Sequence, residues 1–212
     1  MTLQAWAFAA VAALGILLGW MASWRRWRRV VVVARPAAMA SLGGAVLWLP
    51  GLDRGVVAVV ALGLGCNVVG DALLAMPSHR FAAGSMAFLA ARCFYSAAFV
   101  LMGIDAGRAL LVFIVSGFAL MTLGRVLLGQ VRRLRPRLAV GAMAFMAVSA
   151  CSIALGVGTG RPLIGLAVVT LSLADLLLGW NRFVRALSGG HGTIHVVAHG
   201  AQVMLAAALV TW

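Results

Sequence analysis

Long apolar runs dominate the sequence, and one of them already constrains the surroundings in which the chain can fold. No residue between Gly55 and Gly70 is charged, and apolar residues resume directly after Asp71. An α-helix needs about 20 largely apolar residues to cross the hydrocarbon core of a bilayer. Similar runs recur from end to end, and only 10% of the residues are charged, against about 25% in soluble domains. The sequence therefore predicts an all-α polytopic membrane protein and disfavours a soluble protein with a large core.

Eight segments are expected to be transmembrane helices within a single integral membrane domain, residues 1–212. Their expected ranges are 3–23, 30–50, 55–76, 80–103, 107–128, 137–157, 161–182 and 193–212. Short linkers marked by Pro, Gly or charge separate them. Arg35-Pro36 interrupts the second range, so six or seven helices remain an alternative. The first run has no basic residue before it and four Arg after it, which predicts a retained span and not a cleaved signal peptide.

The charges are distributed unevenly between the two sides of the predicted bundle. All 17 basic residues are Arg, and the net charge is +13. Linkers after the first, third, fifth and seventh ranges contain twelve of them, and the other linkers contain three: Arg54, Arg108 and Arg161. The positive-inside rule then places both termini on the non-cytoplasmic side of a bacterial-type cytoplasmic membrane. The positive charge is explained by topology and by contact with anionic membrane lipids, so no nucleic-acid partner is expected.

A weak internal repeat relates two acidic blocks. GDALLAMPSHRF (70–81) resembles ADLLLGWNRF (174–183), because each has a small residue, Asp, leucines and a later Arg-Phe. The two aspartates are four predicted helices apart, so their helices run in the same direction. The pattern suggests two four-helix halves, and chance similarity between Leu-rich helices is the alternative.

Asp71 and Asp175 are the two acids that fall inside predicted spans. An Asp at the centre of a span costs about 2.5 to 3.5 kcal/mol, and such residues usually face a polar interior or a partner. Each Asp precedes the cytoplasmic end of its predicted helix by a similar distance, to within roughly 3 Å at 1.5 Å per residue. We therefore expect both carboxylates in one cavity in the cytoplasmic half of the membrane. A structural hydrogen bond is the alternative for either residue taken alone.

Further polar side chains interrupt the predicted spans at comparable depths or near mid-membrane. Taken singly, each is better explained by a structural hydrogen bond, whereas the set is typical of a functional site. The set comprises Arg35, Asn67, Arg92, Tyr95, Ser172, His195, His199 and Gln202.

Histidines spaced by four residues suggest a metal site at first sight. His191 and His199 lie about 12 Å apart along a straight helix, so one metal ion cannot bind His191, His195 and His199 together. A His195–His199 pair with an Asp is geometrically possible. The sequence nevertheless favours a site with no metal and no cofactor.

Other conspicuous motifs indicate packing. The Gly-rich stretches ALGLGCN and ALGVGTG do not follow a strand, so close helix contact explains them better than a nucleotide loop. Cys66, Cys93 and Cys151 lack metal-site spacing, and we expect them to be buried free thiols.

The blocks around the two aspartates resemble the YhhN-like membrane family, whose characterised members are lysoplasmalogenases. GDALLAMPSHRFAAGSMAFLAARCFYSAAF matches its Gly-Asp block and its pattern of spaced aromatics at Phe81, Gly84, Phe88, Tyr95 and Phe99, with Arg92 where the family has His. The second block is matched by Ala174-Asp175, Leu176 to Leu178, Arg182-Phe183 and Ala201-Gln202, with Ala174 in place of Ser. Arg35-Pro36 resembles the Lys-Pro of the family, and His199 lies near a common Tyr. The resemblance covers about residues 30 to 210.

The resemblance implies hydrolysis of the vinyl ether of a lysophospholipid, giving a fatty aldehyde and a glycerophospho-base. Asp71 and Asp175 would form the catalytic pair. The expected substrate-binding residues are Arg35, Asn67, Arg80, Arg92, Tyr95, Arg182, His199 and Gln202. A proton-coupled transporter of small solutes or lipids, and a non-catalytic lipid-binding homologue, fit the same intramembrane residues.

Overall fold

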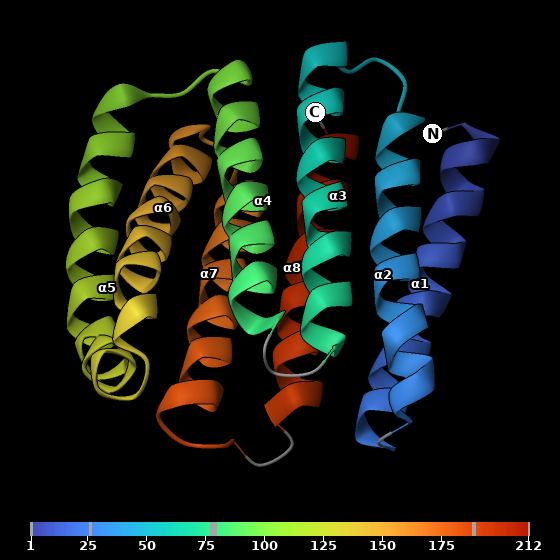
Figure 1. Cartoon of the computed structure of the whole chain (residues 1–212). Helices are drawn as coiled ribbons and strands as arrows, with labels where there is room; N and C mark the ends of the chain where they lie inside the picture. Colours follow the sequence, from blue (N-terminus) through green and yellow to red (C-terminus); the bar gives the residue numbers. More distant parts are fainter. Residues whose placement is uncertain (1, 26, 77–79, 188–189, 212) are drawn as a thin grey trace. The chain divides into compact units, whose positions relative to one another are not determined.

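The computed structural model describes residues 2–25, 27–76, 80–187 and 190–211, with only the backbone of residues 190 and 191. These residues form eight α-helices and one short 3-10 helix, with no strand in the described ranges (Figure 1). The helices are α1 (Leu3–Trp24), α2 (Arg28–Leu47), α3 (Arg54–Ala75), α4 (Phe81–Leu101), α5 (Ala106–Leu134), η2 (Pro136–Leu138), α6 (Ala139–Gly158), α7 (Pro162–Phe183) and α8 (Gly190–Val210). All eight α-helices are long and apolar enough to cross a membrane, which confirms the predicted fold class.

Two helices differ from expectation. Helix α5 continues to Leu134, six residues beyond its predicted end, because nothing in this stretch stops a helix until Pro136. Arg132 and Arg133 therefore lie on the helix and not in a linker, and Arg125 lies on it within the predicted range. Helix α2 passes through Pro36 without a break, although proline removes one backbone hydrogen bond. Membrane helices tolerate this because neighbouring groups satisfy the freed carbonyl.

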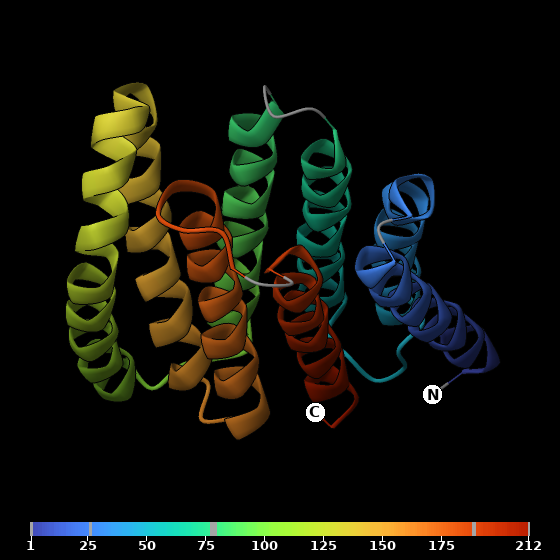
Figure 2. The ribbon, with the colours of Figure 1, turned by 90° about the horizontal axis from the view of Figure 1, so that it is seen from below.

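The chain divides into two compact units. Unit 1 comprises Met1–Leu101 and Ala206–Trp212, and unit 2 comprises Met102–Leu205. Within unit 1, α1 packs on α2, α2 on α3 and α3 on α4, each pair antiparallel (Figures 1 and 2). Within unit 2, η2 joins the hairpin of α5 and α6, and α7 packs on both of these helices. Each unit is thus built largely from helices that are consecutive in the sequence.

The distribution of polar and apolar side chains is the reverse of that in a soluble protein. On α5, the apolar side chains of Leu110, Ile114 and Phe118 are exposed, Phe118 by 73%. Arg92, by contrast, is only 1% exposed, and ten other polar or charged residues are also buried. Exposed apolar faces suit lipid contact, whereas buried polar groups need partners in the interior. The structure is that of an integral membrane protein.

Within each unit, the charges gather mostly at one end. In unit 1, Arg25, Arg28 and Arg29 connect α1 to α2, and Arg80 precedes α4 at the same end, because α1 and α3 run in the same direction. In unit 2, arginines likewise gather where α5 and α7 end: Arg132, Arg133, Arg135, Arg137, Arg182 and Arg185. The side of the membrane on which the termini lie stays a prediction.

Close contact between α3 and α4 depends on glycine. A Cβ added at Gly63 would lie 2.5 Å from Cε1 of Tyr95, and one added at Gly70 would lie 2.5 Å from Cε1 of Phe88. No real Cβ makes such contacts, so the aromatic rings rest directly on the α3 backbone. The interpretation of ALGLGCN as a packing motif therefore holds for Gly63, whereas Gly65 has no neighbour within 4 Å.

The cysteines differ from the prediction. They are free thiols, but Cys66 is half-buried and Cys93 and Cys151 are exposed. The expectation of burial assumed that small apolar residues face the protein interior. In a membrane helix the outward face is apolar as well, so a thiol is tolerated there.

Candidate functional site

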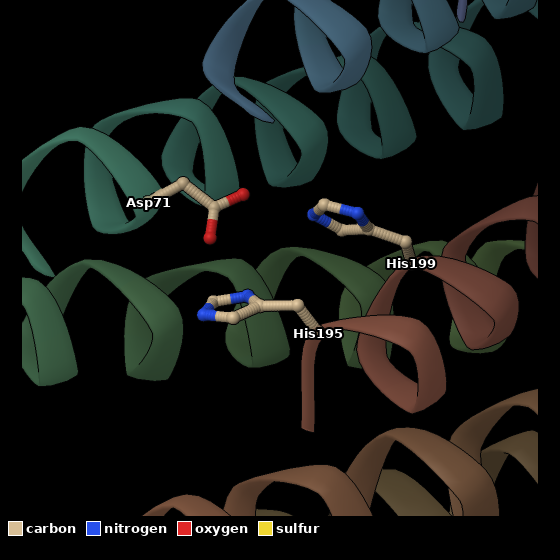
Figure 3. Close-up of side chains that lie close together, drawn as sticks. All are labelled: Asp71, His195 and His199. Atoms are coloured by element: carbon tan, nitrogen blue, oxygen red, sulfur yellow. The ribbon is translucent and has the colours of Figure 1, made fainter. Parts of the chain in front are cut away.

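Asp71 lies in the last turns of α3, on the face that packs against neighbouring helices. Asn67 precedes it by one turn, and both side chains are only 6% exposed. The same face carries Val60, Gly63 and Leu64, so the two polar residues continue the packing stripe of the helix. Asp71 extends from α3 in Figure 3. The sequence prediction that Asn67 and Asp71 share a buried face is confirmed.

A hydrogen bond joins α3 to α4 next to Asp71. Asn67 Nδ2 donates to Tyr95 Oη at 2.6 Å and to the carbonyl oxygen of Gly63 at 3.2 Å. Tyr95 is fully buried, and its ring rests on Gly63. The small residue lets the ring approach the helix, and the amide then satisfies the phenol oxygen. This contact holds the face of α3 that carries Asp71 in a fixed orientation.

Arg92 lies in the middle of α4, one turn before Tyr95, as the sequence predicted. The antiparallel pairing of α3 and α4 places Gly63 by Tyr95 and Gly70 by Phe88. Stepping one turn along each helix from the Asn67–Tyr95 hydrogen bond reaches Asp71 on α3 and Arg92 on α4. In this register Asp71 is level with Ala87, so Arg92 lies more than one turn further along α4 than Asp71, and both charged side chains are buried.

Arg35 connects α2 to α1. Its Nη2 donates to Ser23 Oγ on α1 at 2.6 Å, and its side-chain stem runs over Gly19. Ser23 Oγ in turn donates to the carbonyl oxygen of Gly19. A buried arginine that is held by α1 is a structural element as well as a candidate anion ligand.

We call Arg35, Asn67, Asp71, Arg92 and Tyr95 the unit 1 polar cluster. It contains two arginines and one aspartate within helices that span the membrane by length and composition. Buried charges are tolerated only with partners, so a cluster of this kind is typical of a functional site in a membrane protein.

Asp175 belongs to unit 2 and lies on α7. Its side chain is half-buried, and Ser172, one turn earlier, is buried and donates to the carbonyl oxygen of Val168 at 2.8 Å. The depth estimate needs correction. Asp71 precedes the end of α3 by four residues and Asp175 precedes the end of α7 by eight, or about 6 and 12 Å. The two depths differ by more than the sequence estimate because α3 ends one residue earlier than predicted and α7 ends one residue later.

Helix α8 carries three buried polar side chains on one side: His195, His199 and Gln202. The imidazole rings of His195 and His199 are neighbours, with centroids 5.8 Å apart and planes inclined by 50° (Figure 3). The spacing of four residues brings the rings one above the other along the helix. The side chain of His191, the third histidine of the motif, lies outside the part that the structure describes.

Arg80 and Arg182 occupy a different environment from the other predicted binding residues. Arg80 directly precedes α4, Arg182 lies in the last turn of α7, and both are exposed. They are placed at helix ends, where lipid headgroups meet a transmembrane helix. The structure therefore separates two exposed arginines from the buried residues of the predicted site.

Sequence reasoning missed Ser23. Its hydroxyl accepts the hydrogen bond from Arg35, yet it lies on a helix that carries none of the predicted site residues. The available signal was weak: a serine in the last turn of the first span, directly before WRRWRR. Hydroxyls in membrane helices commonly bond their own backbone, so the residue alone did not indicate a partner twelve positions away.

The fold and these residues define a class: an α-helical membrane protein whose spans bury acidic, basic and imidazole side chains. The sequence model of the YhhN family matches residues 30–209, so the chain belongs to the YhhN family. This confirms the resemblance seen in the two aspartate blocks. No match was found among curated proteins or among solved structures.

Proposed function

We propose that this chain is a membrane-embedded hydrolase that cleaves the vinyl ether bond of a lysoplasmalogen. Family membership supports the reaction class. The observation that carries the proposal is the burial of Asp71 beside a hydrogen-bonded Asn67–Tyr95 pair inside a predicted span. A purely structural aspartate has little reason to occupy such a position, because a buried intramembrane acid is costly.

The reaction needs a proton donor and a base. A carboxylic acid gives its proton to the β-carbon of the vinyl ether, the vinyl carbon that is not bonded to oxygen, and the ether oxygen then shares the positive charge of an oxocarbenium ion. A carboxylate stabilises this cation and takes a proton from water as the water attacks the charged carbon. The resulting hemiacetal collapses to a fatty aldehyde and the free glycerol hydroxyl. Paired carboxylates with these two roles are known from glycoside hydrolysis. We assign the roles jointly to Asp71 and Asp175.

The basic residues suit the phosphate of a lysolipid. Exposed Arg80 and Arg182 meet phosphate at the headgroup level, whereas Arg35 and Arg92 offer a buried guanidinium each. The remaining proposed contacts are hydrogen bonds from Asn67, Tyr95, His199 and Gln202. A lipid with one chain can reach buried groups laterally from the bilayer, so the reaction needs no water-filled entrance.

The test uses purified protein in lipid nanodiscs. Lysoplasmalogen is added, and aldehyde and glycerophospho-base are both quantified. Lysolipids of the same head group with an acyl ester or a saturated alkyl ether serve as substrate controls. We expect release from the vinyl ether alone, and its loss in Asp71→Asn and in Asp175→Asn. Undiminished release in either variant would refute the paired-carboxylate mechanism.

The two alternative functions give different results in the same preparation. A carrier releases no aldehyde but shows proton-dependent uptake in sealed vesicles. A lipid-binding homologue retains the lysolipid without cleaving it. If Arg92 in place of the family histidine is the cause of such a loss, Arg92→His restores aldehyde release. Either of these outcomes overturns the proposal that the chain as it stands is a hydrolase.

A further inference from the structure

The paired histidines of α8 are not explained by the proposed carboxylate chemistry. His195 and His199 are 5% and 2% exposed, and both lie on a helix whose other residues are mostly apolar. One buried histidine is often a structural hydrogen-bonding group. Two of them on consecutive turns of one helix face are also the arrangement in which helices chelate a metal ion, as in motifs with histidines at positions i and i+4.

The distance between the rings fits chelation. A zinc ion lies about 2.1 Å from a ligating imidazole nitrogen, which puts it ~3.2 Å from the ring centroid. Two imidazoles on one tetrahedral ion then have centroids ~5 Å apart, and ~6.4 Å at most. The observed centroid separation is 5.8 Å. The rings need only a small side-chain adjustment to share one ion, and both already project from the same side of α8 (Figure 3).

We propose that His195 and His199 bind a divalent transition metal ion, zinc in the first instance. Neutral imidazole nitrogen is a favoured ligand for zinc, copper, nickel and iron. Although the sequence alone favoured a site without metal, the geometry of the pair outweighs that expectation. Metal binding is tested separately from the proposed hydrolysis, because the measured quantity is bound metal and not released aldehyde.

The remaining ligands are limited by composition. A zinc site with an open position usually has three protein ligands. Cys93 and Cys151 are exposed and Cys66 only half-buried, which makes thiolate ligands at a buried pair a poor choice. The chain has four acids, and only Asp71 and Asp175 fall inside helices. One of these two carboxylates is the expected third ligand, and the experiment decides which.

Binding is measured on the full-length protein with a purification tag that contains no histidine. After dialysis against a chelator, Zn²⁺ is added back, and bound metal is counted by mass spectrometry and its affinity measured by competition with a chromophoric chelator. We expect about one ion per chain, and a loss of affinity of at least ~100-fold in His195→Ala and in His199→Ala. Val203→Ala, on the exposed side of α8, is the matched control and should bind as the native protein does.

Cobalt substitution gives an absorption spectrum that depends on the metal ligands and would not change if the histidines had only a structural role. Co²⁺ bound by nitrogen and oxygen ligands in a four-coordinate site gives visible absorption without a sulfur charge-transfer band. His199→Cys retains a ligand at the same position and should add that band in the near ultraviolet. Size-exclusion profiles and helical circular dichroism of each variant confirm that the protein is folded.

Three results would overturn the assignment. The first is the absence of bound Zn²⁺ or Co²⁺ above the level of the His195→Ala/His199→Ala double variant. The second is full retention of metal by both Asp71→Asn and Asp175→Asn. The third is loss of metal in His191→Ala with no change in His199→Ala, which would move the pair one turn along the helix. None of these measurements depends on aldehyde release, so this inference and the proposed hydrolysis fail separately.

Discussion

Helix α3 carries an aspartate at each end, and the two have opposite environments. Asp53 is the N-cap: its Oδ1 accepts hydrogen bonds from the backbone nitrogens of Gly55 at 2.8 Å and Val56 at 3.1 Å. Asp71, eighteen positions later, lies within the helix, where the backbone has no free N–H to offer. It is buried and is surrounded by side chains. The same residue type therefore stabilises the backbone at one end and is the proposed catalytic group at the other.

Helix α5, like α3, begins with an aspartate that caps its first turn. Asp105 precedes the helix, and its Oδ1 accepts a hydrogen bond from the backbone nitrogen of Arg108 at 2.9 Å. The acids outside the spans thus have a local explanation in helix capping. The acids inside the spans do not, and this difference singles out Asp71 and Asp175 as functional candidates.

The largest expected effect comes from making the same substitution at both ends of α3. Asp71→Asn should lower aldehyde release by about 10²- to 10⁴-fold, because it removes a carboxyl group that transfers or receives a proton in the proposed mechanism. Asp53→Asn keeps a side-chain oxygen that caps the helix and should leave the rate within about twofold. The rates are compared at equal amounts of folded protein. Equal losses of aldehyde release in both variants would contradict the distinction between a capping Asp53 and a catalytic Asp71.

The second prediction concerns the contact that holds the polar face of α3. Gly63→Ala places a methyl group against the Tyr95 ring and should lower stability by about 1 to 3 kcal/mol, the usual cost of overpacking. Thermal unfolding in detergent measures this. Gly65→Ala lies two positions away on the same helix with no neighbour within 4 Å. This control should be neutral or slightly stabilising, since Ala has the higher helix propensity. Equal destabilisation by both would contradict the close Gly63–Tyr95 contact.

A third experiment measures the cap directly. Asp53→Ala should cost about 1 kcal/mol, because the first turn of α3 loses the acceptor for two backbone N–H groups. Asp53→Asn should recover most of that loss in the same unfolding assay. Aldehyde release per folded molecule should stay unchanged in both. A loss of activity without a loss of stability would show that Asp53 has a role beyond capping.

The smallest expected effect is the coupling between Asn67 and Tyr95. A double-mutant cycle of Asn67→Leu and Tyr95→Phe isolates the 2.6 Å hydrogen bond from the cost of each substitution. Interhelical hydrogen bonds in membrane proteins average about 0.6 kcal/mol and reach about 1.7. We expect a value in this range from unfolding in detergent mixtures. Strict additivity of the two variants would show that the bond contributes nothing measurable.

Much of the architecture was predictable from the sequence, because in a membrane protein the lipid imposes a length and a composition on every span. The existence of all eight helices followed from the apolar runs, and five of the eight have both ends within two residues of the predicted ones. The end of α5 did not follow, because its arginine-rich stretch remains helical as far as Pro136. Charge marks the edge of the bilayer but does not end a helix.

The candidate site was predictable as a set of residues but not as an arrangement. The rarity of acids, histidines and arginines inside spans was sufficient to select Asp71, Arg92 and His199. The same rarity could not reveal that Tyr95 bonds to Asn67, or that Arg35 bonds to Ser23. Those partners depend on which faces of neighbouring helices meet.

The sequence by itself determined the class of the protein, its helices and its family, since each of these follows from residue order along one chain. The tertiary structure decided which polar groups satisfy one another inside each unit. The physical reason is that lipid offers no hydrogen bonds, so every buried polar side chain has to find its partner on another turn or another helix. Gly63 lets Tyr95 approach α3, and Gly19 makes room for Arg35. In both places close packing determines which side chains form the hydrogen bond.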